Sequence, residues 1–167
     1  LDACIGGKTG VNFPPYGKNQ IGLFAFPSQV LISTGWLKTL DTREFYSGLA
    51  EGYKHALISG DRKLAAGVAT FDPVQDSIEP LLFDLIQVKA DIVAQDPTEQ
   101  GVRAVLNLGH TFAHAWERIA HQQDADLLHG EAVSLGLLFM LRLSLELGLL
   151  PQEDFRVMKL LVLMLLV

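Results

Sequence analysis

Cysteine is almost missing from this chain of 167 residues, in which Cys4 is the only one. A single cysteine excludes an internal disulfide, which favours an intracellular, cytoplasmic location over a secreted one. Basic residues are also in short supply, since 13 Lys and Arg stand against 19 Asp and Glu, for a net charge of −6. This charge argues against a general nucleic-acid or anionic-membrane surface. A small anionic substrate is still compatible with it, because cations can gather locally.

The chain also lacks an apolar run long enough to cross a membrane. The terminal run Leu160–Val167 is far shorter than the roughly 20 residues of a transmembrane helix. The longer stretch from Ala132 to Leu150 contains Arg142 and Glu146, so a buried helix is the better interpretation. The first residues do not resemble a signal peptide. We therefore expect no membrane partner.

Both ends of the chain look cut. It starts without Met, just before a glycine motif, and it ends in an apolar run with no capping residue. We interpret it as a fragment of a larger protein, with a naturally short protein as the alternative.

The composition and periodicity predict a mostly α fold with an irregular, glycine-rich arm at the start. Apolar residues make up 49% and charged residues 19%, which is typical of a globular chain. Asp41-Thr42-Arg43-Glu44 has capping-box spacing and predicts a helix to about Ser59. Further helices are expected over about 77–94, 103–121 and 129–148, with loop over 1–27 and a short strand at 30–33. We divide the chain into an arm, residues 1–40, and a helical domain, residues 41–167.

Four polar residues would share one face if residues 103–115 formed a single helix. Arg103, Asn107, His110 and His114 then lie within about 60° of one another, at i, i+4, i+7 and i+11. An ordinary solvated helix face would carry Lys and Glu instead. This face is therefore a candidate binding surface, provided that the helix runs unbroken past Gly109.

Three segments supply candidate metal ligands: Glu51, His110 and His129. Two imidazoles and one carboxylate suit a catalytic Zn²⁺, because three protein ligands leave a position open for substrate or water. His110 and His114 could also be a ligand pair by themselves. Each histidine taken alone is more often a hydrogen-bonded structural residue, and Glu51 alone is more often a surface carboxylate.

A group of cations is the second chemical feature, made up of Lys8, Lys18, Lys54, Lys89 and Arg103. Lys8 stands among glycines whose backbone could approach an anion closely. The spacing is not that of a P-loop, and a plain turn is the default interpretation. Lys54 follows Glu51 by one helical turn, so it could reach the same pocket or form an ordinary helix ion pair.

Taken together, these motifs resemble the 3-dehydroquinate synthase family of sugar-phosphate cyclases. The matching stretches run in the family's order from Asp2 to about Gly148 and include Gly6-Gly7-Lys8-Thr9-Gly10, Gly17-Lys18-Asn19-Gln20-Ile21-Gly22, Leu37-Lys38-Thr39-Leu40, Gly48-Leu49-Ala50-Glu51, Leu106-Asn107-Leu108-Gly109-His110-Thr111-Phe112 and Leu128-His129-Gly130-Glu131-Ala132. Each stretch alone is moderate evidence, whereas the ordered set is highly specific. The resemblance implies the helical, metal-binding C-terminal domain of such a protein, with the connecting arm.

The resemblance implies a phosphate-eliminating lyase of the shikimate pathway, which forms 3-dehydroquinate and phosphate from 3-deoxy-arabino-heptulosonate 7-phosphate. It implies bound NAD and Zn²⁺ or Co²⁺, and a homodimer in the full-length protein. The implied metal ligands are Glu51, His110 and His129. The residues implied to face NAD are Asp2, Lys8, Lys18, Trp36, Leu37, Lys38 and Thr39. Those implied to contact the substrate or act in catalysis are Asn19, Lys54, Lys89, Arg103, Asn107 and His114.

Two alternatives stay open from the sequence. One is a related cyclase that makes an inosose or a valiolone, and the other is a catalytically silent helical domain that binds a metal. The family's nucleotide-binding N-terminal half has no counterpart here, and residues 1–40 would form only the edge of the NAD site. We therefore expect the isolated fragment to be inactive.

Overall fold

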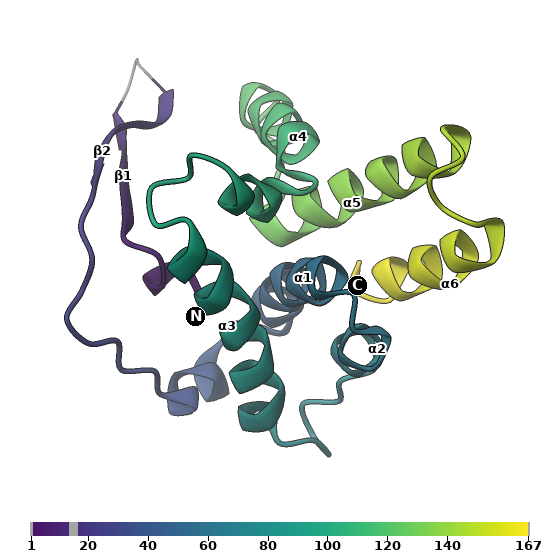
Figure 1. Ribbon diagram of the computed structural model, residues 1–167, viewed down its shortest axis with the longest axis horizontal. Helices are drawn as coiled ribbons and strands as arrows, with labels where there is room; N and C mark the ends of the chain where they lie inside the picture. Colours follow the sequence, from purple (N-terminus) through teal and green to yellow (C-terminus); the bar gives the residue numbers. More distant parts are fainter. Residues whose placement is uncertain (1, 14–16, 167) are drawn as a thin grey trace.

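Helix α1 (Thr42–Ser59) lies at the centre of the structure, with the other helices packed around it (Figure 1). The computed structural model describes residues 2–13 and 17–166, without the side chains of Asp2, Asn12 and residues 17–20. The side chain of Asp41 caps α1 by accepting the N–H of Arg43 at 2.9 Å. Gly60 ends the helix in the left-handed region, with φ of 73°. The sequence predicted this helix and both of its ends.

The remaining helices confirm the mostly α prediction. In chain order they are η1 (Asp2–Cys4), η2 (Thr34–Thr39), α2 (Arg62–Ala69), α3 (Ile78–Gln95), η3 (Val102–Asn107), α4 (His110–Gln122), α5 (His129–Glu146) and α6 (Gln152–Leu163). The sequence prediction missed α2 and α6. Helix α2 begins just after α1 ends, where Asp61 accepts the N–H groups of Lys63 and Leu64.

The glycine-rich arm contains a β-hairpin where the sequence predicted loop. Strands β1 (Lys8–Phe13) and β2 (Gly17–Phe24) pair antiparallel, with Thr9 opposite Leu23 and an irregularity between Val11 and Phe13. In Figure 1 the hairpin stands at the edge of the molecule, beside the helices. The short strand predicted at 30–33 is wrong, because no described strand pairs with that segment.

The single helix predicted over residues 103–115 is also wrong. Helix η3 ends at Asn107, Gly109 has φ of 77°, and α4 starts afresh at His110. Arg103 and Asn107 therefore do not share a helix face with His110. A glycine is needed at the break, since positive φ strains other residues.

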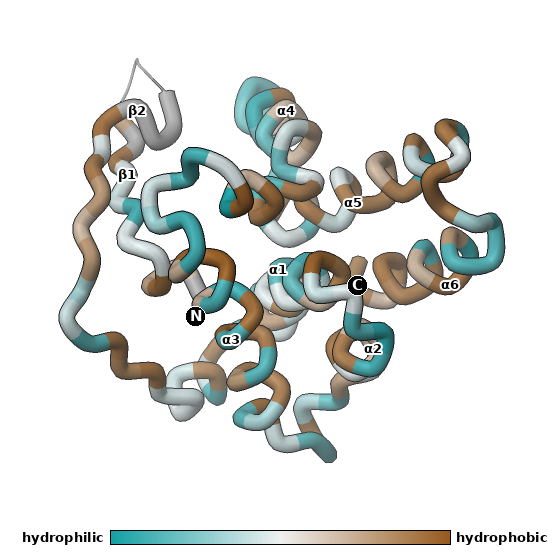
Figure 2. Tube along the Cα trace, viewed as in Figure 1, coloured by the Kyte–Doolittle hydropathy of each residue, from teal (hydrophilic) through white to brown (hydrophobic). Residues whose placement is uncertain are grey.

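The core forms where α1, α2, α3, α5 and α6 meet. Tyr53, Val68 and Leu137 are among its most deeply buried side chains. Figure 2 shows hydrophobic stretches along α5 and α6 and a largely hydrophilic α4. Among the described residues, none of the helices is both long enough and apolar enough to cross a bilayer.

Candidate metal centre

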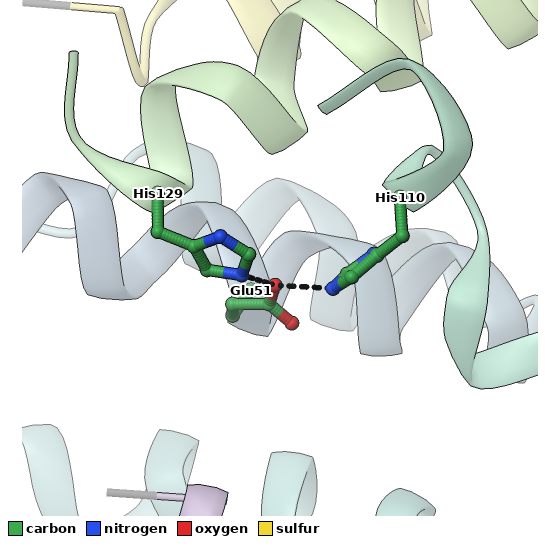
Figure 3. A group of neighbouring side chains, drawn as sticks. All are labelled: Glu51, His110 and His129. Atoms are coloured by element: carbon green, nitrogen blue, oxygen red, sulfur yellow. Dashed lines mark hydrogen bonds and ion pairs between the residues drawn. The ribbon is translucent and has the colours of Figure 1, made fainter. Parts of the chain in front are cut away.

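Glu51, His110 and His129 meet in one place, although they come from three different helices (Figure 3). Glu51 Oε1 lies 3.3 Å from His110 Nε2 and 3.2 Å from His129 Nε2. One donor atom from each of the three lies within 4.8 Å of the others. Within residues 2–13 and 17–166 this is the one such group of His, Cys, Asp and Glu. Its two nitrogens and one carboxylate oxygen fit a zinc site that keeps an open position.

Two glycines on α5 bring the three ligands together. A Cβ on Gly130 would lie 1.9 Å from the carbonyl oxygen of Ser47, so only glycine lets α5 touch α1 there. The backbone N–H of Gly130 also donates to Ser47 Oγ at 3.0 Å. Ser47 is one turn before Glu51, and Gly130 directly follows His129, so this contact sets the spacing of the two ligands.

The third ligand is fixed by a similar contact further along α5. A Cβ on Gly136 would lie 2.2 Å from the carbonyl oxygen of Gly109, the residue directly before His110. The break between η3 and α4 is therefore pressed against the backbone of α5. This contact between Gly109 and Gly136 directs His110 toward Glu51.

The first turn of α5 is also held by side chains. Glu131 accepts the N–H of Leu128 at 2.9 Å, and Arg43 of α1 donates to both oxygens of Glu131 at 2.5 and 2.8 Å. Arg43 also pairs with Asp126. These bonds fix the end of the helix that carries His129.

The acid at the centre of the group is held in its charged form. Burial raises the pKa of Glu51, but the hydrogen bonds with His110 and His129 and the charge of Lys54 lower it more. Its pKa therefore lies well below the usual range. The hydrogen bond with Glu51 raises the pKa of His129, against the effect of burial and with help from Glu117.

Four of the predicted cations gather near this centre. Lys54 is buried, and its Nζ lies 2.5 Å from Glu51 Oε2, so it forms the helix ion pair that was one of the two interpretations of the sequence. Burial lowers the pKa of Lys8, and the charges of Arg103, Lys89 and Lys54 lower it further. These charges act on Lys8 over short separations, so the four side chains form a cationic region, which Lys54 joins to Glu51.

Arg103 is buried, with 2% of its surface exposed. It donates to the carbonyl oxygen of Gly6 at 2.7 Å and to that of Pro97, and its guanidinium lies 5.6 Å from the ring centre of Phe24. It thus joins the arm to the helical body. Its Nε is buried without a hydrogen-bond partner among the described residues.

Glu99 is a residue that the sequence reasoning missed. It has φ of 60°, accepts a hydrogen bond from Asn107 Nδ2 at 2.5 Å and forms an ion pair with Lys8. No sequence pattern indicated that Glu99 would have this strained, left-handed backbone conformation.

His114 and Glu117 extend the centre along α4. The ring centre of His114 lies 5.5 Å from that of His110 and 6.5 Å from that of His129. Glu117 Oε1 lies 3.0 Å from His129 Nδ1. The sequence reasoning missed Glu117, although His110, His114 and Glu117 at i, i+4 and i+7 are a recognisable helix face.

Four of the residues predicted to face NAD belong to the short helix η2. Trp36 is 77% exposed, and Leu37 and Lys38 line a hollow of about 370 Å³ between η2 and the starts of α1 and α3. Thr39 is exposed on the same short helix. The side chains of three further predicted residues lie outside the described part of the structure: Asp2, Lys18 and Asn19.

Comparisons with known proteins decide the family. Residues 48–165 match the model of the 3-dehydroquinate synthase C-terminal domain, and residues 1–47 match that of the N-terminal domain. The chain belongs to the 3-dehydroquinate synthase family. It is 43% identical over 155 residues to the 3-dehydroquinate synthase of Helicobacter pylori, covering 93% of this chain and 44% of that protein.

Further relatives support this membership. The 3-dehydroquinate synthase of Listeria monocytogenes serotype 4a is 47% identical over 147 residues, which cover 86% of this chain and 40% of that protein. The chain therefore spans less than half the length of these two curated relatives.

Solved structures share the fold. One is ValA, the 2-epi-5-epi-valiolone synthase from Streptomyces hygroscopicus with NAD⁺ and Zn²⁺ bound, which is 30% identical with a TM-score of 0.77 and matches 99% of this chain and 46% of that one. A 2-deoxy-scyllo-inosose synthase complexed with carbaglucose-6-phosphate, NAD⁺ and Co²⁺ has a TM-score of 0.79 at 24% identity, over 98% of this chain and 45% of that one.

Proposed function

We propose that this chain is the metal- and substrate-binding part of a 3-dehydroquinate synthase, a lyase that forms 3-dehydroquinate and phosphate from 3-deoxy-arabino-heptulosonate 7-phosphate. The observation that carries the proposal is the convergence of Glu51, His110 and His129 from three helices, beside a cationic region. The higher identity to 3-dehydroquinate synthases than to the valiolone synthase favours this substrate.

Glu51, His110 and His129 would hold a divalent metal, with Zn²⁺ or Co²⁺ as the candidates. A metal bound there supplies Lewis-acid polarisation of a substrate oxygen. The donor set supports this, because two imidazole nitrogens and one carboxylate oxygen face one another with Lys54 paired to the second carboxylate oxygen. Lys54 is then close enough to the metal site to contact a substrate held there.

The cationic region would bind the anionic groups of the sugar phosphate. Lys8, Lys54 and Lys89 offer ammonium donors, and Arg103 offers a buried Nε–H that lacks a partner among the described residues. A buried donor of this kind is expected to find an acceptor. A substrate carboxylate or phosphate would supply one.

Neutral and proton-carrying groups complete the proposed site. His114 lies beside both ligand histidines and would hold or move a proton near the substrate phosphate. Asn107 would orient the substrate by hydrogen bonding, and Asn19 is proposed from the family resemblance alone.

We propose further that residues 1–40 are the connecting arm and the edge of an NAD site, and that residues 41–167 are the metal- and substrate-binding domain. NAD⁺ would supply the hydride acceptor. The hollow of about 370 Å³ along Leu37 and Lys38 has room for part of a dinucleotide. The residues proposed to line this edge are Asp2, Lys8, Lys18, Trp36, Leu37, Lys38 and Thr39. The full-length protein is proposed to be a homodimer.

The test is phosphate release, measured with the 167-residue chain alone and fused to the part of the Helicobacter pylori relative that lies outside the matched region. We expect turnover of the heptulosonate phosphate, with NAD⁺ and Zn²⁺, by the fusion and not by the chain alone. His110→Ala in the fusion should abolish it. Correct orientation of reacting groups can supply about 7–11 kcal/mol of a barrier, which half a site cannot provide.

Each other outcome rejects part of the proposal. Phosphate release by the fusion from glucose 6-phosphate alone would favour an inosose-forming cyclase. Zinc binding without turnover of either sugar phosphate would favour a silent metal-binding domain. Turnover by the short chain at the rate of the fusion would show that the site does not extend beyond it.

A further inference from the structure

Glu117 stands behind one of the three candidate ligands. It lies on α4, seven residues after His110, so that His110, His114 and Glu117 project from one side of this helix. Glu117 Oε1 lies 3.0 Å from Nδ1 of His129, which is on α5. The side chain of Glu117 is only 13% exposed. Helix α4 thus supplies one ligand and also supports the ligand that α5 supplies.

The two ligand histidines are held in the same way. His110 directs Nε2 to Glu51, and its Nδ1 lies 3.2 Å from the carbonyl oxygen of Leu108. His129 also directs Nε2 to Glu51, and its Nδ1 faces Glu117. In both histidines an oxygen acceptor lies within hydrogen-bonding distance of Nδ1, the ring nitrogen that points away from Glu51. The acceptor for His110 is main chain and that for His129 is a side chain, so the latter can be removed by substitution.

We propose that Glu117 is a positioning residue that sets the metal affinity of the site. Its carboxylate accepts the Nδ1–H of His129 and so fixes the tautomer in which Nε2 presents its lone pair to the metal. The inference rests on the proposed metal site at Glu51, His110 and His129.

The exposure of the two partners explains why support is needed here. The side chain of His129 is 44% exposed, whereas that of His110 is 15% exposed. Packing alone therefore restrains the His129 ring less, and its orientation depends more on the bond to Glu117. A carboxylate acceptor also makes the imidazole a stronger base than a neutral acceptor does.

The experiment measures zinc affinity of the 167-residue chain by competition with a chromophoric chelator. Glu117→Ala removes the acceptor, and Glu117→Gln keeps an amide oxygen in its place without the charge. The matched controls are Glu146→Ala and Glu146→Gln, which remove a charge from an exposed carboxylate at the far end of α5. Long-range ¹H–¹⁵N spectra of the zinc-bound chain report which nitrogen of His129 carries the proton.

We expect Glu117→Ala to weaken zinc binding about 10–100-fold. Glu117→Gln should weaken it less, and the Glu146 variants by less than twofold. The spectra of the unmodified chain and of Glu117→Gln should show His129 with its proton on Nδ1. A fall in the zinc affinity of Glu117→Gln, with its urea unfolding midpoint unchanged, would distinguish the positioning role from a purely structural one. A purely structural role would change the unfolding midpoint instead.

Two results would overturn the inference. One is zinc affinity of both Glu117 variants within twofold of the unmodified chain, and the other is a zinc-bound His129 with its proton on Nε2. Failure of the metal site itself is recognised separately, since His110→Ala would then bind as much zinc as the unmodified chain does.

Discussion

Gly130 of α5 lies directly against Ser47 of α1, with its backbone nitrogen 3.0 Å from Ser47 Oγ and no room for a Cβ. The two ligands nearest to this contact are His129, the preceding residue, and Glu51, one turn after Ser47. The distance between the two helix backbones therefore determines whether these ligands can meet.

Replacing Gly130 should separate the helices. In Gly130→Ala the new methyl group would clash with the backbone of Ser47, so α5 must move away from α1. This should cost about 1–3 kcal/mol in the free energy of unfolding. Zinc affinity should fall as well, because His129 moves away from Glu51. Urea unfolding and a chelator competition measure the two effects.

Gly48→Ala is the matched control for this change. A Cβ at Gly48 meets nothing within 4 Å, so alanine should stabilise α1 by about 0.5–1 kcal/mol and leave zinc affinity unchanged. Equal behaviour of the two alanine variants would contradict the role given to the Gly130 contact.

Zinc should raise the thermal stability of the chain. A ligand that binds the folded state stabilises it by about 2.7 kcal/mol at a hundred times its Kd. The Tm of the unmodified chain should therefore rise with added Zn²⁺ and return on adding a chelator, as followed by circular dichroism. His110→Ala should lose this response, whereas the exposed His121→Ala, on the same helix, should keep it. If the Tm of the unmodified chain did not change on adding Zn²⁺, a high-affinity zinc site would be excluded.

Protonation of Asp96 should lower the free energy of unfolding in acid. Its pKa is lowered mainly by the backbone N–H of Gln100, and those of Gly101 and Arg103 add to this against burial. A lowered folded pKa means that the stabilisation is complete above the unfolded pKa of about 3.9 and is lost as the pH falls through the folded value. Asp96→Asn turns an amide toward N–H donors and should be destabilising at pH 7.

The measurement is urea unfolding of both proteins from pH 7 to pH 3. The difference in free energy of unfolding between the unmodified chain and Asp96→Asn should stay constant to about pH 5 and shrink below about pH 4. Asp84→Asn, an exposed carboxyl on α3, is the control. A difference that grows as the pH falls would have the wrong sign for this explanation.

Local signals predicted much of the helical body. The capping motif at Asp41 and the expected end near Ser59 agree with the ends of α1, and the ends of α5 are close to those predicted. The ordered motifs also identified Glu51, His110 and His129 as a set, and the structure brings them together.

The errors arise where distant backbone contacts decide the conformation. The break at Gly109 depends on its contact with Gly136, which a helical periodicity between residues 103 and 115 cannot reveal. The hairpin likewise depends on pairing between Thr9 and Leu23, within a segment whose glycines indicated loop. Glu117 was missed because its partner, His129, lies on another helix.

The last prediction concerns the arm, which Arg103 joins to the helical body through the carbonyls of Gly6 and Pro97 and the ring of Phe24. Arg103→Ala leaves these two carbonyls without their donor, which should cost about 1–3 kcal/mol in the free energy of unfolding. Arg103→Lys should also loosen the arm, because one ammonium lacks the flat, forked geometry that reaches both carbonyls and stacks on a ring.

Limited proteolysis with mass spectrometry measures this directly. Both Arg103 variants should be cut faster within residues 1–40 than the unmodified chain, while cleavage within the helices should change much less. The exposed Arg118→Ala on α4 removes a charge of the same kind and should leave the pattern unchanged. Since the arm carries Lys8 and the proposed edge of the NAD site, unchanged cleavage in the Arg103 variants would mean that another contact holds the arm. Arg103 would then be left only with its proposed role toward the substrate.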